Sequence, residues 1–129
     1  MKKILILMNH KLTDEQEKEL KDQGYEIHYL PRKLQEKFSN VDPSNVVCAA
    51  KEIADYVLNN DFDAVVLQGH NVLCAYLWYL LMKNNVRILY AHSKREVQEI
   101  PQEDGSVKKV SIFKHEGFHE YANFPVLLK

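Results

Sequence analysis

The sequence predicts an α/β protein, a Rossmann-like parallel sheet flanked by helices with a C-terminal β-hairpin extension. Four short apolar segments that read as strands alternate with segments of helical periodicity. This alternation is typical of a parallel sheet built with right-handed crossovers. After the fourth strand, two β-rich segments follow, joined by a stretch that contains Asp104 and Gly105. Asp-Gly between β-rich segments indicates a hairpin.

The first half of the chain begins with a strand over residues 3–9, apolar throughout like a strand covered on both faces. Thr13 and Gln16 have the spacing of a capping box, so we expect a charged helix to begin there. Gly24 is suited to the end of this helix. A second strand then covers residues 25–30.

The next helices are predicted from their start signals. Residues 32–40 form a polar connection that allows one or two helical turns. Asp42, followed by proline, is suited to the N-cap of a helix whose apolar face continues to Leu58. The third strand covers residues 63–68.

The last elements are an apolar helix, a strand and the hairpin. Asn71 is the expected N-cap of a helix that ends near Met82. Its apolar stretch is shorter than the ~20 residues that cross a membrane, so we expect a buried helix. The fourth strand covers residues 86–91, and the strands of the hairpin cover 97–100 and 107–113.

Length and composition limit the possible functions. The chain has 129 residues, of which 46% are hydrophobic and 27% charged, so we expect one domain over residues 1–129. The formal net charge of −1 argues against binding to duplex DNA, which needs a basic surface. We find no signal peptide and no membrane segment. We therefore expect a cytoplasmic protein with Cys48 and Cys74 as buried, reduced thiols.

Polar segments that carry histidine follow three of the four predicted strands. They are Asn9-His10 after the first strand, Gln68-Gly69-His70-Asn71 after the third, and His92-Ser93-Lys94-Arg95 after the fourth. The carboxyl ends of parallel strands lie at one edge of a sheet, and open α/β sheets bind ligands there. We therefore expect these three turns to form one site.

The residue types in these turns are suited to an anionic ligand. Gly69 lets the backbone approach a ligand, and the helix that starts at Asn71 offers free N–H groups. The segment lacks the glycine patterns of dinucleotide-binding folds and P-loops, so NAD and ATP are not favoured. An ordinary turn from strand to helix would have the same sequence.

Positive charge is concentrated after the fourth strand and near the end of the hairpin. Lys94 and Arg95 can bind phosphate oxygens, and Ser93 adds a hydroxyl group. Lys114 and His115 follow the second strand of the hairpin and can close over an anionic ligand. In each case the alternative is a solvent-exposed polar segment without a ligand.

Metal binding receives little support, and we expect neither a metal nor another cofactor. Residues 115–119 match the H-E-x-x-H pattern of zinc proteases, which requires a helix. Residues 110–113 are strand-like, and Gly117 weakens any helix by roughly 1 kcal/mol. A second alternative is a zinc site formed by His10, His70 and His92, although no spacing in the sequence requires it.

Several motifs are spread along nearly the whole chain. They are Ile4 to His10, Leu12 to Gln16, Tyr29-Leu30-Pro31, Val66 to Gly69, Tyr90-Ala91 through Arg95-Glu96, Gln102 to Gly105, Ser111 to His115, and Phe118. Together they resemble a family of small stand-alone CRISPR-associated ring nucleases, similar to CRISPR-associated Rossmann-fold (CARF) domains. Their order and spacing together carry the resemblance.

The resemblance implies a single CARF-like domain that forms a homodimer and binds cyclic tetra-adenylate across the two-fold axis. It also implies cleavage of this ring without a metal, by attack of a ribose 2′-OH on the neighbouring phosphate. The products are linear oligoadenylates with 2′,3′-cyclic phosphate ends. Their formation switches off antiviral signalling in type III CRISPR systems.

The residues in the turns are suited to this chemistry, which needs donors on phosphate oxygens and a proton shuttle. The predicted catalytic residues are His10, His70, Ser93, Lys94 and Arg95. The predicted ligand-binding residues are Asn9, Gln68, Gly69, Asn71, Lys114 and His115. Two alternatives stay open: a non-catalytic sensor or sponge for the same ligand, and an unrelated metal-dependent hydrolase.

Overall fold

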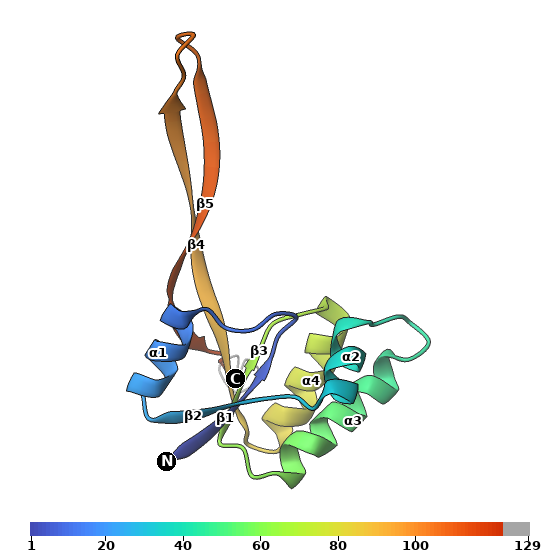
Figure 1. Ribbon diagram of the computed structural model, residues 1–129. Coiled ribbons are helices and arrows are strands. Elements are labelled where there is room, and N and C mark those ends of the chain that lie inside the picture. The colour runs from blue at the N-terminus through green and yellow to red at the C-terminus, as the bar shows by residue number, and fades with distance from the viewer. Residues whose placement is uncertain (123–129) are drawn as a thin grey trace.

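The computed structural model describes residues 1–122, which contain a five-stranded sheet in the order β2-β1-β3-β4-β5 (Figure 1). The first four strands are parallel, and the last pairs antiparallel with its neighbour. The strands are β1 (Lys2–Leu7), β2 (Tyr25–Tyr29), β3 (Ala64–Leu67), β4 (Arg87–Pro101) and β5 (Val107–Glu120). The predicted α/β class with a C-terminal hairpin is therefore confirmed.

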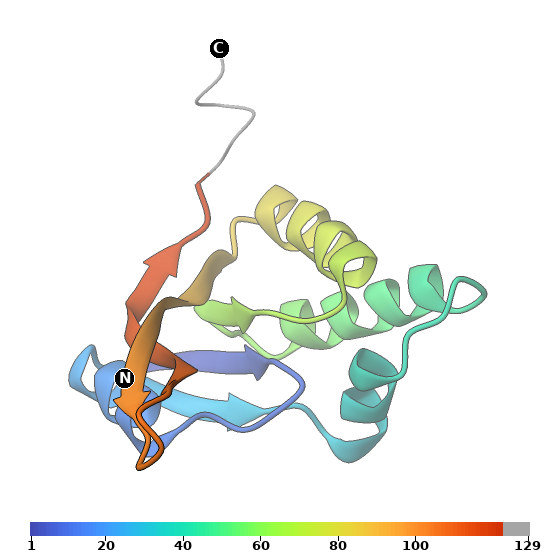
Figure 2. The same ribbon diagram turned by 90° about the horizontal axis from the view of Figure 1, so that it is seen from above.

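Helices cover both faces of the sheet. They are α1 (Asp14–Asp22), α2 (Arg32–Ser39), α3 (Val46–Asn59) and α4 (Asn71–Lys83). On one face, Leu20 of α1 packs with Ile4 and Ile6; on the other, α2, α3 and α4 pack against Leu5 and Leu7. Figure 2 shows α3 and α4 side by side. Successive residues of β1 thus enter opposite cores, which explains its unbroken apolar sequence.

The starts of α1 and α3 differ in how well the sequence predicts them. The capping box of α1 is confirmed, since Thr13 Oγ1 accepts the N–H of Gln16 at 3.2 Å and Gln16 Oε1 accepts the N–H of Thr13 at 3.0 Å. The predicted N-cap at Asp42 is wrong, because α3 begins at Val46. The Asp42 carboxylate instead accepts the N–H of Ser44 at 2.7 Å and closes a turn.

Helix α4 begins one residue earlier than predicted and is less buried. Its N-cap is His70, whose Nδ1 accepts the N–H of Val72 at 3.2 Å, so the prediction of Asn71 as the cap is wrong. Leu73, Leu77 and Leu81 face the core, as expected for a buried helix. The opposite side of α4 is exposed and carries Tyr76 and Tyr79, 41% and 58% exposed.

Strands β4 and β5 continue far beyond the sheet as a two-stranded hairpin (Figure 1). We call residues 92–117 the arm. The prediction that His92 to Arg95 form a turn is wrong, because β4 is continuous through them. Within residues 1–122 the strands of the arm pair only with each other, and beyond its base the arm has solvent on both faces, so a polar sequence is compatible with a strand there.

A β-bulge lies where the arm leaves the sheet. His92 pairs with Gly117 and Ser93 pairs with His115, so Glu116 is the extra residue. Gly117 has a φ of +128°, a conformation that residues with a side chain rarely adopt. Bulges bend strands and increase their twist, and this bend directs the arm away from the sheet.

The two cysteines are free, and Cys74 is half-buried. Cys48 is exposed, so the prediction of a buried thiol is wrong at this position. In the first turns of α3 the core-facing residues are Val46, Ala49 and Ala50, and Cys48 lies on the solvent side of the helix. Within residues 1–122, no helix combines the length and the apolar character that crossing a membrane requires.

Candidate functional site

The strand order creates a crevice at the carboxyl edge of the sheet. From β1 the chain crosses to β2 on one side, whereas β3 and β4 lie on the other. The loops after β1 and β3 therefore diverge, and doubly wound sheets with this order bind ligands at that point. The N–H of Gln68 donates to the carbonyl of Leu7 at 2.9 Å, which holds the starts of the two loops together.

A pocket of about 480 Å³ lies beside this crevice, between the loop after β1 and helix α2. Two predicted site residues, Asn9 and His10, line it. Its other lining residues are Met8, Lys11, Tyr29, Leu30, Arg32, Gln35, Glu36, Ser39 and Asn40. The α2 side was missed by sequence reasoning. The place of β2 beside β1 in the sheet brings α2 to this edge, and the order of the elements along the chain does not determine that place.

Hydrogen bonds from α2 hold the wall of this pocket. Gln35 Nε2 donates to the carbonyl of Met8 at 2.9 Å and to Ser39 Oγ at 3.1 Å. Tyr29 donates its hydroxyl to Glu17 at 3.1 Å, and burial raises the pKa of Tyr29. The pocket thus joins a fixed aromatic ring to exposed amide, imidazole and cationic groups, a combination that can hold a nucleobase and its phosphate.

In the loop after β3, Gln68 and Gly69 have roles that the fold itself explains. The Gln68 amide accepts the N–H of Ala91 at 3.0 Å and donates to the carbonyl of Ala91 at 3.3 Å. It therefore fixes the start of the arm. A Cβ on Gly69 would lie 2.7 Å from the ring of Phe38, so packing of α2 requires glycine there.

His70 and Asn71 present polar groups to solvent at the start of α4. Both residues are exposed, and Nδ1 of His70 accepts a backbone N–H. The proton of the neutral ring is therefore on Nε2, which is available as a donor. His10 differs, because its Nδ1 lies 3.0 Å from the carbonyl of Lys11. In the neutral ring this bond places the proton on Nδ1 and leaves Nε2 as an acceptor.

The predicted site residues Ser93, Lys94 and Arg95 follow one another along β4 in the arm, so each lies farther from the crevice than the one before it. Lys114 lies opposite Lys94 on β5. Lys94 and Lys114 are direct cross-strand partners, and neither makes a salt bridge within residues 1–122. Like charges in this arrangement destabilise a hairpin. Arg95 donates to Ser111 Oγ at 2.9 and 3.2 Å. The Lys94–Lys114 pair is thus a site of uncompensated positive charge.

His115 lies away from the crevice, against α1. Its side chain is 10% exposed, and its Nε2 lies 2.7 Å from Glu19 Oε2. The other carboxylate oxygen of Glu19 accepts the N–H of Phe118 at 3.1 Å. His115 Nδ1 is buried without a hydrogen-bond partner in the described chain. This pair attaches the base of the arm to α1, and no pattern in the sequence indicates that Glu19 is involved.

The H-E-x-x-H segment lies on β5 rather than on a helix. His115 faces Glu19, whereas His119 packs against Tyr90 and His92, with ring centroids 6.0 and 5.7 Å away. The two histidines therefore point to opposite faces and cannot bind one zinc ion as in zinc proteases. Within residues 1–122, no three His, Cys, Asp or Glu side chains converge as metal ligands.

The three segments at the carboxyl edge share a charge pattern. Residues 8–13, 68–71 and 92–95 contain no aspartate or glutamate. They contain Lys11, Lys94, Arg95 and three histidines, which are His10, His70 and His92. A local excess of donors and cations favours an anionic ligand, although the whole chain is slightly acidic.

Fold and site together define a doubly wound α/β protein with a donor-rich crevice at the switch point and a projecting arm. The chain belongs to the family described as Uncharacterized protein MJ1673, whose model matches residues 2–119. It is similar to Uncharacterized protein MJ1673 of Methanocaldococcus jannaschii, with 32% identity over 131 residues. This match covers 94% of the present chain and 98% of that protein. No solved structure matches the chain.

Proposed function

We propose that this protein is a metal-independent ring nuclease that binds and cleaves cyclic tetra-adenylate. The observation that carries the proposal is the absence of acidic residues from the three segments at the carboxyl edge, beside a pocket of about 480 Å³. The motif resemblance supplies the ligand. The substrate has phosphates that need cations and adenosines that need pockets, and this edge offers both.

The pocket between α2 and the loop after β1 is the proposed adenosine subsite. Tyr29 supplies a ring wall, while Asn9 and Asn40 supply amides for the edges of a base. Lys11 and Arg32 line the same pocket and supply positive charge to the adjoining phosphate, for which Arg32 would exchange its exposed salt bridge with Glu36, 3.4 Å away on the same wall. The Lys94–Lys114 pair on the arm would neutralise a second phosphate.

The proposed reaction is in-line attack of a ribose 2′-OH on the adjacent phosphorus. A new bond forms between O2′ and phosphorus, and the bond from phosphorus to the 5′-oxygen of the next nucleotide breaks. His10 Nε2 takes the proton from the 2′-OH, and His70 Nε2–H donates to the phosphate or the leaving oxygen. Lys94 and Arg95, which lie farther out on the arm, supply positive charge at the neighbouring phosphate of the ring. The product end is a 2′,3′-cyclic phosphate.

The proposal includes a homodimer, because one protomer offers one such edge for a ring with four phosphates. A two-fold axis through the ring gives each protomer two phosphates to bind. In a cytoplasm with type III CRISPR signalling, cleavage of the ring would end the antiviral signal. No cofactor enters this reaction.

The test is incubation of the purified protein with cyclic tetra-adenylate in EDTA, followed by chromatography of the products. We expect linear products with 2′,3′-cyclic phosphate ends. Intact ring after prolonged incubation with equimolar protein would contradict ring cleavage. Loss of activity in EDTA with recovery on adding zinc would favour the metal-dependent hydrolase.

Two variants test the site within this assay. Arg32→Ala should weaken ligand binding by at least about tenfold, the effect of losing one charge-assisted contact. The control is Lys33→Ala, which removes the next cation on α2, a residue that does not line the pocket. Equal effects of both substitutions would argue against this pocket as the subsite.

His70→Ala should lower turnover by ~100-fold or more, the range for a positioned acid–base group. His70 also caps α4, so His70→Asn is the matched variant, because asparagine retains an acceptor for the N-cap. We expect His70→Asn to keep the thermal stability but not the turnover. Wild-type turnover in His70→Asn would remove the imidazole from the mechanism.

The second candidate is a sensor or sponge that binds the same ring without cleaving it. One observation favours it: the ring nitrogens of His10 and His70 bond to backbone groups, and no carboxylate within residues 1–122 orients them. In the described chain, the histidines paired with carboxylates are His28, His92 and His115, outside the pocket. Tight binding of a ring that is recovered intact would establish this function.

A further inference from the structure

The outer surface of α3 and α4 is unusually apolar. The large hydrophobic side chains on it are Leu58, Tyr76, Val72, Tyr79 and Val47, with exposed fractions of 37%, 41%, 42%, 58% and 65%. Within residues 1–122, every other exposed large hydrophobic side chain except Met1 belongs to β4 or β5 beyond the sheet. Concentrations of this kind on a surface mark sites of association.

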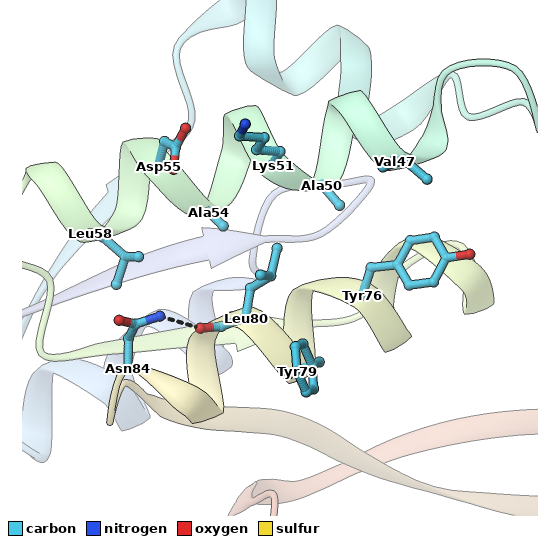
Figure 3. A pocket seen from close by; sticks show the side chains of 10 residues that line it. All are labelled: Val47, Ala50, Lys51, Ala54, Asp55, Leu58, Tyr76, Tyr79, Leu80 and Asn84. Carbon is cyan, nitrogen blue, oxygen red and sulfur yellow. Dashed lines mark hydrogen bonds between the residues drawn. The ribbon is translucent and has the colours of Figure 1, made fainter.

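A groove of about 480 Å³ runs between the two helices. Its lining residues are Val47, Ala50, Lys51, Ala54, Asp55, Leu58, Tyr76, Tyr79, Leu80 and Asn84 (Figure 3). Figure 3 shows Leu58 and Leu80 pointing into the space between the helices, with the tyrosines of α4 along its lower side. The small residues Ala50 and Ala54 line its base and are 1% and 2% exposed, so a partner would meet chiefly the exposed side chains along its sides.

The charges at this groove are complementary to each other. Lys51 and Asp55 line it one helical turn apart on α3, and neither makes a salt bridge within residues 1–122. In a two-fold interface, a contact from residue i to residue j occurs twice, because j of the first protomer also meets i of the second. A groove with one cation and one anion can therefore pair with a second copy of itself, because each cation then meets the partner's anion.

We propose that the α3/α4 surface is the interface through which two copies of this chain form a symmetric dimer. The tyrosines of one copy fill the groove of the other, and Lys51 of each protomer pairs with the partner's Asp55. The interface is on one face of the sheet, so the crevice at the carboxyl edge stays open. A two-fold axis parallel to α3 and α4 would place the crevices of both protomers at the same end of the dimer.

This dimer is the homodimer on which the proposed function rests, and the proposal assigns its interface to the α3/α4 surface. Its test needs no ligand. Light scattering after gel filtration should give twice the protomer mass of 15.1 kDa for the wild-type chain. Val47→Glu and Tyr79→Glu should raise the dissociation constant by at least about 100-fold, as for central apolar contacts of an interface. Both side chains are exposed, so the protomer should stay folded by circular dichroism.

The matched control is Val97→Glu, since Val97 is an exposed valine of the arm, 57% exposed against 65% for Val47. We expect its mass to equal that of the wild type. A monomeric wild type would overturn the proposal and leave this surface to a different protein. Dissociation by Val97→Glu alone would also overturn it and would place the interface on the arm.

A charge exchange tests the pairing itself. Lys51→Glu and Asp55→Lys should each weaken the dimer by about tenfold, a usual coupling for a close charge pair. The double variant restores opposite charges and should recover an affinity near that of the wild type. Additive weakening in the double variant would contradict the pairing. Ring cleavage by a protein that is monomeric in all these assays would separate the dimer proposal from the proposed function.

Discussion

At the scale of single residues, Gly69 shows that a glycine in a ligand-binding position can be required by packing. The added Cβ of alanine would lie 2.7 and 2.8 Å from two ring atoms of Phe38, which is 1% exposed and has little room to move. Gly69→Ala should therefore lower the free energy of unfolding by roughly 1–3 kcal/mol, the cost of overpacking. Urea denaturation measures this change.

A second substitution decides whether the ring of Phe38 is the cause. Phe38→Leu shortens the side chain that meets Gly69, at a cost of its own in packing. In the Gly69→Ala background, Phe38→Leu should cost less than it does in the wild type. Equal costs in both backgrounds would show that the strain from alanine arises elsewhere in the loop.

The two cysteines should react at different rates. Cys48 is exposed, whereas burial raises the pKa of the Cys74 thiol and lowers its thiolate fraction at neutral pH. We expect iodoacetamide to modify Cys48 first, which mass spectrometry of timed samples can measure. In Cys48→Ser the remaining thiol should react slowly until the protein is unfolded. Faster modification of Cys74 would contradict the described packing of α4.

At the scale of elements, the arm marks the limit of what the sequence predicts. The four parallel strands and α1 were predictable, because apolar runs and a capping box have local causes. The strand after Ala91 was not, because beyond its base the arm has solvent on both faces and needs no apolar alternation. Ser93, Lys94 and Arg95 therefore resemble a loop in sequence, although they pair with β5 in the structure.

Lys94→Glu separates the stability of the arm from ligand binding. It replaces a pair of like charges by a cross-strand salt bridge with Lys114, worth about 0.2–1 kcal/mol, so the melting temperature should stay or rise. Affinity for cyclic tetra-adenylate should fall by about tenfold. The control, Lys108→Glu, makes the same charge reversal nearer the tip of the arm and should leave the affinity unchanged. Equal losses of affinity would remove the Lys94–Lys114 pair from the site.

The attachment of the arm to α1 depends on Glu19. Glu19→Ala removes the acceptor of the Phe118 N–H and leaves His115 without its partner, at a cost of about 1–3 kcal/mol. Hydrogen exchange at the Phe118 amide should accelerate at least about tenfold, since the arm base opens more easily. Glu15→Ala, one turn earlier on α1, should have little effect. Unchanged exchange in Glu19→Ala would show that β5 pairing alone protects this amide.

At the scale of the whole molecule, the sequence predicted the edge of the sheet that carries the candidate site but only part of its residues. Asn9 and His10 start beside the loop after β3, because adjacent parallel strands end together. The contribution of α2 was missed, since the spatial order of the strands decides which loops are neighbours. His115 was placed at the wrong surface, because a bulge determines the face of β5 on which each side chain lies.

That bulge also determines where the chain can change in length. Glu116 is the extra residue of β5, so its deletion would keep the pairs of β4 and β5 but remove the bend and the added twist. The arm would then leave the sheet in another direction, and His115 would lose its place against Glu19. An extra glycine after Asp104, in the turn at the tip, alters no pairing below it. Deletion of Glu116 should thus lower the melting temperature and the protection of the Phe118 amide, whereas the insertion should change neither. Relatives of this chain would then vary in length at the tip of the arm and keep a constant length at its base.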